Sequence, residues 1–284
     1  MRVGLLFFGL HRFANLTKSN LLRILPSGWE LKVYSHSWKS SDGVHAPWVK
    51  AHDLEVASDE EFRALWPSVN AVEEAFTQSE PPCVASSDPH FANFSGYESR
   101  RSVFRMMCSI SMVCEMALHD EGNDCSRFVM TRTDFLCFLG LPEPLSSNPP
   151  VGVFFPNLRR NNGFCDWFLV FDKNALRVLS RLRYSFEALV METMSFAGEE
   201  LLLRALENGG CKVKSFEWRG ILVRDSELAD SRFGKLPMTK EFFRKRTAQL
   251  FRSRVSNILD SIAGKIQSIN SLQGSTRKKI RSSP

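Results

Sequence analysis

The sequence has no apolar stretch that is long enough to cross a membrane. Its N-terminal run, Val3–Phe8, spans about six residues, whereas a spanning helix needs roughly 20. The seven cysteines include no Cys-x-x-Cys pair and are odd in number, which argues against zinc and against a disulfide framework. These absences predict a cytoplasmic protein, either soluble or held peripherally at the inner face of the cell membrane.

Several familiar catalytic patterns are missing as well. The sequence lacks the Gly-x-Gly-x-x-Gly turn and the Walker pattern, so neither a nicotinamide cofactor nor a P-loop is supported. It also lacks a histidine cluster with metal-ligand spacing and any Ser/His/Asp or Cys/His arrangement of the hydrolase type. What the chain does have is the composition of an ordinary globular protein, with 43% hydrophobic and 24% charged residues among its 284.

Charge is unevenly distributed along the chain. In total, 37 lysines and arginines face 31 aspartates and glutamates, which gives a formal charge of +6. Residues 240–284 hold eleven basic and two acidic residues, so this tail carries +9 and residues 1–239 carry −3. A mildly acidic body disfavours nucleic acid as its partner, and an anionic partner is expected to meet the tail.

The apolar pattern divides the chain into three parts. Residues 1–238 alternate strand and helix patterns, which predicts an α/β domain with a mostly parallel twisted sheet flanked by helices. Residues 239–272 predict a basic amphipathic helix, which either packs on the body or in a homo-oligomer, or lies on an anionic membrane surface. Residues 273–284 are basic and polar, and they are expected to be disordered.

The predicted elements follow from apolar runs and their punctuation. Strands are expected at Val3–Phe8, Leu31–Ser37, Phe128–Met130, Val151–Phe155, Phe168–Phe171 and Lys212–Phe216, and helices at Ala14–Leu25, Glu98–His119 and Gly198–Glu207. Ser58 and Glu61 form a capping box, which opens a helix predicted to reach Phe76 despite Pro67. Asp172 is predicted to cap a further helix.

Polar residues that follow the predicted strands are the candidates for chemistry. Gly9 and Arg12 follow the first strand. The guanidinium of Arg12 could bind a phosphate with two hydrogen bonds, or Arg12 could be an ordinary surface residue. His36 and Trp38 end the second strand, although a lone histidine is more often structural. The next strand ends in Arg132 and Asp134; an aspartate there either holds a divalent cation or forms a turn.

A third group of candidates surrounds the strand that begins at Phe168. Asp166 could bind sugar hydroxyls or act as a base, and Trp167 could stack on a ring, while a turn with a buried tryptophan is the alternative. Glu199 and Glu200 open a helix and could reach the same crevice, although acidic residues are ordinary at helix N-termini.

The order of these segments resembles a family of small bacterial and viral glycosyltransferase-type proteins with the GT-A nucleotide-diphospho-sugar transferase fold. The matching segments are Gly-x-x-Arg at Gly9, His-Ser-Trp at His36, Ser102 with Arg105, Arg-Thr-Asp at Arg132, Asn-Gly-Phe-x-Asp-Trp at Asn162, and Glu-Glu-Leu-Leu at Glu199. The resemblance covers roughly residues 2–210. It departs from the family pattern at Met130, where the first arginine of the strand-end motif would stand, and Thr-x-Asp offers one carboxylate instead of two.

The resemblance implies transfer of a sugar from a nucleotide-diphosphate donor to a hydroxyl of a glycan or lipid-linked acceptor. It implies donor binding by Gly9, Arg12, His36, Arg105, Arg132 and Trp167, a divalent ion (manganese or magnesium) at Asp134, and catalysis by Asp166 and Glu200. With a single carboxylate, arginine or lysine could neutralise the diphosphate instead of a metal. Two other functions stay open: a non-catalytic sugar-nucleotide or glycan-binding protein, and a nucleic-acid-binding protein that acts through the basic tail.

Overall fold

The computed structural model of the protein describes residues 1–11, 14–38, 58–86, 97–137, 140–142, 145, 151–157, 164–216 and 220–222. Arg12 and the whole of residues 239–284, including the predicted basic helix, lie outside the described residues. Within the described part, no helix is long and apolar enough to cross a membrane.

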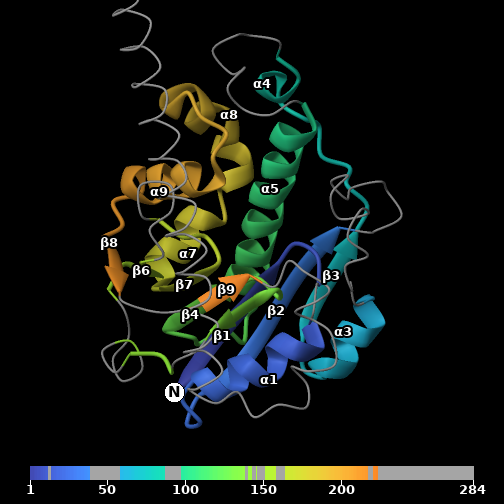
Figure 1. Ribbon diagram of the computed structural model, residues 1–284, viewed down its shortest axis with the longest axis vertical. Helices are drawn as coiled ribbons and strands as arrows, with labels where there is room; N and C mark the ends of the chain where they lie inside the picture. The colour runs from blue at the N-terminus through green and yellow to red at the C-terminus, as the bar shows by residue number, and fades with distance from the viewer. Residues whose placement is uncertain are drawn as a thin grey trace, which may run out of the picture. The chain divides into compact units, whose positions relative to one another are not determined.

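The described part is built on a seven-stranded sheet of order β3-β2-β1-β4-β7-β6-β8 (Figure 1). Its strands are β1 (Arg2–Phe8), β2 (Glu30–Trp38), β3 (Asn70–Glu74), β4 (Arg127–Thr131), β6 (Val153–Pro156), β7 (Phe168–Phe171) and β8 (Val213–Phe216). Strands β3, β2, β1 and β4 are parallel, whereas β7 is antiparallel to both of its neighbours, β4 and β6. The mostly parallel α/β sheet predicted from the sequence is therefore confirmed.

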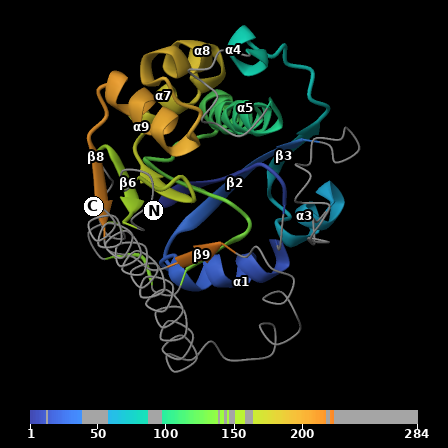
Figure 2. The ribbon, with the colours of Figure 1, turned by 45° about the horizontal axis from the view of Figure 1, so that its top comes forward.

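Helices cover both faces of the sheet. They are α1 (Ala14–Ile24), α3 (Asp59–Leu65), α4 (Pro82–Ala85), α5 (Tyr97–His119), α7 (Lys173–Leu179), α8 (Leu182–Thr193) and α9 (Gly198–Asn208). Figure 2 shows α5, α7, α8 and α9 on one side of the sheet, with α1 on the other. A small second sheet pairs β5 (Phe135–Cys137) with β9 (Gly220–Leu222) and lies on the α1 side (Figure 2).

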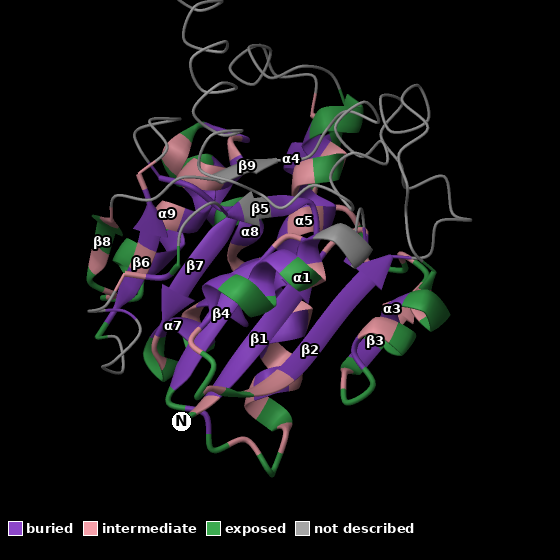
Figure 3. Cartoon of the chain, turned by 60° about the horizontal axis from the view of Figure 1, so that its bottom comes forward, coloured by how far each residue is buried: buried purple, intermediate pink, exposed green. Residues whose placement is uncertain are grey.

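The central strands are apolar on both faces because helices bury both faces. The six residues from Val3 to Phe8 are buried, and so is every residue of β4 and β7 (Figure 3). A strand that is buried on one face alone would alternate apolar and polar residues. The continuous apolar runs in the sequence therefore identify the middle of the sheet correctly.

One predicted helix is wrong. The capping box of Ser58 and Glu61 is present, but α3 ends at Leu65 and the chain turns at Trp66. Pro67 lacks the N–H that a continuing helix would use, and its ring crowds the preceding turn. Beyond it, β3 pairs in parallel with β2, aligning Ala71 with Ser35, so sheet pairing replaces the expected helix.

Asp172 is confirmed as a helix cap and also holds the preceding loop. Its Oδ1 accepts a hydrogen bond from the N–H of Ala175 at 2.9 Å, and its Oδ2 accepts one from the N–H of Gly152 at 2.6 Å. Gly152 has a φ of +99°, and a Cβ there would lie 2.1 Å from the carbonyl oxygen of Lys212. Asp172 therefore joins the start of α7 to a backbone turn that only glycine fits.

We expect Asp172→Ala to lower the free energy of unfolding by about 1–2 kcal/mol, the usual cost of losing a helix N-cap. Urea unfolding followed by circular dichroism measures this loss. Asp124→Ala is the control, because it removes an exposed carboxylate that pairs with Arg2 at 2.7 Å, and it should leave the unfolding midpoint unchanged. Equal midpoints for the two variants would contradict the role of Asp172.

Candidate functional site

The candidate site lies at the edge of the sheet where β1 and β4 end. From β1 the chain continues through β2 to β3 on one side, and β4 then returns to the other side of β1. Ligands of open α/β sheets bind beyond the carboxyl ends of the strands at such a reversal of strand order. Because β7 runs antiparallel to β4, its first residues lie at the same edge (Figure 3).

The first wall of the site is the turn after β1. Gly9 has a φ of +80°, which side chains with a Cβ rarely adopt, and its N–H donates to the carbonyl oxygen of His36 at 3.1 Å. The same N–H contacts the Oγ of Ser109 on α5 at 3.0 Å. The turn is therefore held by both β2 and α5.

The second wall is the turn after β4. The hydroxyl of Thr133 donates to the carbonyl oxygen of Leu10 at 2.9 Å, and it thereby ties this turn to the one after β1. On the other side, the N–H of Arg132 and the hydroxyl of Thr131 both donate to the carbonyl oxygen of Trp167, at 3.2 and 3.1 Å. Three chain segments distant in sequence are thus joined at one edge by hydrogen bonds.

Arg132 and Asp134 form a two-pronged ion pair within this turn. The Nε and Nη2 of Arg132 each lie 2.8 Å from a different oxygen of Asp134. The side chain of Asp134 is only 3% exposed, whereas that of Arg132 is 20% exposed. Burial works to lower the pKa of Arg132, but the carboxyl groups of Asp134, Asp166 and Glu199 together outweigh it, so the pKa is raised and Arg132 stays a cation.

Asp166 is a buried carboxyl group beside this pair. It is 4% exposed, and among the described residues its Oδ1 has no hydrogen-bond partner. Burial raises its pKa to about 6, and the nearby charge of Glu199 adds to the rise while Arg132 opposes it. A carboxyl group with a pKa near neutrality can accept a proton and release it again, which suits a general base.

The acidic start of α9 completes the local charge. Glu199 and Glu200 both lie in the first turn of α9, and the charge of Glu199 acts on both Asp166 and Arg132. One guanidinium therefore lies among three carboxyl groups, those of Asp134, Asp166 and Glu199. Glu200 is only partly buried, and its assignment as a catalytic residue stays a prediction.

The residues around Asp134 do not form a metal centre as they are arranged. Among the described residues, no three His, Cys, Asp or Glu side chains lie close enough together to hold a metal ion. Both oxygens of Asp134 are bonded to Arg132, and divalent cations such as magnesium need several oxygen ligands. The predicted metal at Asp134 therefore stays a prediction that the present donor set does not fit.

His36 and Arg105 lie in a different layer, between the sheet and α5. His36 is completely buried; its Nδ1 lies 2.9 Å from the Oγ of Ser109 and its Nε2 lies 3.3 Å from the Oε1 of Glu74. The guanidinium of Arg105 lies 4.7 Å from the ring centre of Phe76. Their role as donor-binding residues stays a prediction. His36 is linked to the turn after β1 through its carbonyl oxygen and through Ser109.

Two residues of the site were not predicted, Ser109 and Thr133. Ser109 interrupts the apolar face of a long helix, which was a usable signal for a buried hydrogen-bonding role. Thr133 stood inside the Arg-Thr-Asp segment, but only the pairing of β1 with β4 brings it to Leu10. Trp167 is 7% exposed, so its ring is mostly covered and its carbonyl oxygen makes the contacts described above.

The chain matches no family model and no curated protein. Among solved structures it is similar to the glycosyltransferase GlyE of Streptococcus pneumoniae TIGR4, with 11% identity and a TM-score of 0.40 over 76% of this chain and 45% of that one. It is similar to a glycosyltransferase involved in glycosylation of the major capsid of PBCV-1, with 11% identity and a TM-score of 0.37 over 76% of this chain and 82% of that one. It is also similar to the galactosyltransferase LgtC, solved with donor and acceptor sugar analogs, with 10% identity and a TM-score of 0.37 over 76% of this chain and 73% of that one.

The chain thus spans less than half of the length of the GlyE structure. Likeness of this degree places no individual side chain.

We expect Asp166→Asn to stabilise the fold at neutral pH. The pKa of Asp166 is raised in the folded protein, so ionisation favours the unfolded chain as pH rises from about 4 to about 6. The asparagine variant avoids this cost, so its stability advantage should grow through that window and then level off, at up to about 3 kcal/mol. Urea unfolding at pH 4, 5, 6 and 7 measures the difference.

The control is Asp124→Asn, which changes an exposed carboxylate whose pKa Arg2 lowers. Its stability relative to the wild type should stay nearly constant from pH 5 to pH 7, because a lowered pKa places the ionisation of Asp124 below this range. A constant difference between Asp166→Asn and the wild type at all four pH values would show that Asp166 ionises normally.

Proposed function

We propose that the protein is a glycosyltransferase that uses a nucleotide-diphosphate sugar. The observation that carries the proposal is the joined set of turns at the strand-order reversal, where Arg132 and a buried carboxyl group, Asp166, lie beside the glycine turn after β1. Such reversals are where α/β sheets hold nucleotides. In displacement of a diphosphate, a fixed cation can stabilise the negative charge of the leaving group, and a titratable carboxyl group can accept the proton of the acceptor hydroxyl.

Arg132 is the proposed partner of the departing diphosphate. A guanidinium has five N–H donors, and Asp134 accepts hydrogen bonds from two of them, which leaves three. Arg132 also keeps 20% of its side chain exposed, so those donors have a route to a ligand. In this arrangement Asp134 acts as a positioning residue, because it holds the cation in place before the negative charge develops.

Asp166 is the proposed base. In the transfer step, the acceptor hydroxyl oxygen bonds to the anomeric carbon of the donor sugar, and the bond from that carbon to the diphosphate oxygen breaks. The diphosphate leaves with the bonding electrons, and the hydroxyl proton passes to Asp166. Its pKa of about 6 leaves it mostly ionised and ready to accept the proton at neutral pH. Glu200 is the proposed alternative base.

The remaining residues predicted to bind the donor are proposed to have supporting roles. Gly9 lets the backbone approach the donor, Trp167 lines the floor of the site, and His36 and Arg105 support the site from the α5 layer. Arg12 would add a second cation at the β1 turn. Because the oxygens of Asp134 are both hydrogen-bonded by Arg132, the proposal assigns the charge compensation to Arg132 and gives no step to a divalent ion.

The test is release of nucleoside diphosphate from a panel of nucleotide-diphosphate sugars, first with water and then with glycan acceptors. Arg132→Ala and Asp166→Asn should each lower the rate by about 10²–10³-fold, as expected for losing a charge-stabilising group or a base. Arg63→Gln is the control, because Arg63 is an exposed residue of α3, and it should keep the wild-type rate.

Two further measurements separate the alternatives. If Asp134 positions Arg132, activity should survive a chelator, and Asp134→Ala should lose it with or without added manganese. If a donor raises the stability of the protein but no donor yields nucleoside diphosphate, the protein binds sugar nucleotides without catalysis. If none of the donors shifts the stability or is cleaved, the proposed function is wrong.

The basic tail is proposed to hold the protein against an anionic membrane, near a lipid-linked acceptor. Residues 240–254 contain six basic residues, each worth about 1 kcal/mol when placed near such a surface. Changing all six residues to glutamine in the full-length chain should abolish flotation of the protein with anionic vesicles. The same change should leave its flotation with neutral vesicles unchanged. Loss of salt-sensitive duplex binding without any change in flotation would favour the nucleic-acid alternative.

A further inference from the structure

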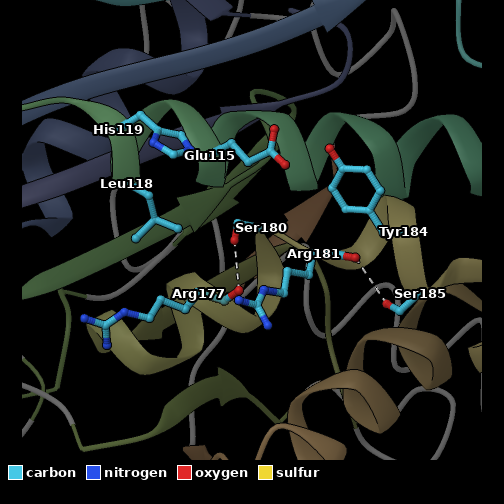
Figure 4. A pocket seen from close by; sticks show the side chains of 8 residues that line it. All are labelled: Glu115, Leu118, His119, Arg177, Ser180, Arg181, Tyr184 and Ser185. Atoms are coloured by element: carbon cyan, nitrogen blue, oxygen red, sulfur yellow. Dashed lines mark hydrogen bonds between the residues drawn. The ribbon is translucent and has the colours of Figure 1, made fainter.

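A hollow lies on the helical face of the molecule, between α5 and the junction of α7 with α8. We call it the α5–α8 basin, and its volume is about 510 Å³, within the usual size of small-molecule sites. Its lining residues are Glu115, Leu118, His119, Arg177, Ser180, Arg181, Tyr184 and Ser185. Figure 4 shows the α5 side chains on one side of the hollow, facing those of the α7–α8 junction.

The basin lies away from the site at the strand ends. Glu115 and His119 are in the last turns of α5, and the chain then passes Asp120 and enters β4 at Arg127. Asp120 contacts Lys32 at 2.8 Å, in the first half of β2. The C-terminal end of α5 therefore lies near the starts of these strands, whereas Arg132 follows the end of β4.

The basin carries an excess of positive charge. Its one carboxylate, Glu115, lies 2.8 Å from the Nη2 of Arg183 and is neutralised by it. Among the described residues, neither Arg177 nor Arg181 has an ion-pair partner, although both are exposed to the basin. Two guanidinium groups without an ion-pair partner among the described residues therefore line the α7–α8 side of the basin, and arginine forks suit phosphate oxygens in particular.

The helix dipoles explain the position of Arg177 but not that of Arg181. It lies in the last turn of α7, where a cation interacts favourably with the negative end of the helix dipole. Arg181 is the residue that precedes α8, the start of which is the positive end of that helix, so the dipole disfavours a cation there. A negatively charged ligand would reverse this unfavourable term.

Tyr184 gives the basin a flat, amphipathic surface beside these cations. It is 71% exposed, and the guanidinium of Arg183 lies 4.6 Å from its ring centre. The hydroxyl group of Ser185 donates to the carbonyl oxygen of Arg181 at 3.3 Å, so its oxygen remains able to accept a hydrogen bond from a ligand hydroxyl, whereas Ser180 is buried. An exposed ring with a nearby acceptor suits the apolar face and the hydroxyls of a sugar.

We propose that the α5–α8 basin binds a phosphorylated sugar. The phosphate would lie between Arg177 and Arg181, and the sugar ring would cover Tyr184. The site is separate from the proposed transferase site and does not depend on it, so donor and phosphorylated sugar should bind independently.

The test is binding of glucose 1-phosphate to the full-length protein, measured by calorimetry at physiological ionic strength, with inorganic phosphate and glucose as comparison probes. Glucose 1-phosphate should bind the wild type at least fivefold more tightly than inorganic phosphate, and glucose alone should not bind. Arg177→Gln/Arg181→Gln should weaken glucose 1-phosphate binding at least tenfold. Tyr184→Ala should bind glucose 1-phosphate and inorganic phosphate equally.

Arg63→Gln/Arg204→Gln is the matched control, because it removes two positive charges from exposed arginines of α3 and α9 and leaves the basic tail intact. It should bind glucose 1-phosphate like the wild type. Equal weakening in both double variants would assign the binding to net charge or to the tail and overturn the proposal. So would unchanged binding in Arg177→Gln/Arg181→Gln, or inorganic phosphate that binds as tightly as glucose 1-phosphate to the wild type.

Discussion

The antiparallel pairing of β7 with β4 is the constraint on which the candidate site depends. Thr131 aligns with Phe168, so the residues that precede β7 come back to the edge at which β4 ends. A parallel β7 would place Asp166 at the opposite edge of the sheet. The reversal is fixed by backbone hydrogen bonds in the fully buried centre of the sheet, and it therefore holds the carboxyl group of Asp166 near Arg132 without any side-chain bond between them.

The buried carboxyl groups at this edge differ in how many hydrogen bonds they accept. Asp134 is almost fully buried yet has two hydrogen bonds from Arg132, whereas the Oδ1 of Asp166 has no partner among the described residues. A buried, poorly satisfied carboxyl group costs stability, and such groups persist chiefly where they serve a function. This contrast is the reason for proposing that Asp134 supports the site and that Asp166 acts in its chemistry.

The position of Arg132 could be predicted, because β1 and β4 are parallel strands that end at the same edge. Asp166 precedes β7, and it reaches this edge through the antiparallel pairing of β7 with β4, which the apolar run of β7 does not reveal. His36 and Arg105 show where such reasoning stops. A strand end says where a residue lies along the strand but not which face it takes, and His36 faces α5 and contacts Ser109.

The helix predicted to run past Pro67 failed for a related reason. Apolar residues near Ala71 fit a helical face as well as a strand, and only the neighbouring strand decides between them. Likewise, the link from Thr133 to Leu10 joins residues more than a hundred positions apart, so no local pattern could have predicted it. No pattern in the sequence distinguishes Arg177 and Arg181, the two proposed phosphate-binding residues of the α5–α8 basin, from ordinary surface charges.

The outermost strands of the large sheet bear on how the protein behaves in a crowded solution. β3 and β8 are only five and four residues long, and among the described strands each has a neighbour on one side alone. Their free edges invite pairing with other chains, but β3 ends in Glu73 and Glu74, and β8 carries Lys214. Short, charged border strands discourage growth of the sheet from one molecule into the next. Pairing between the border strands of two molecules is therefore disfavoured.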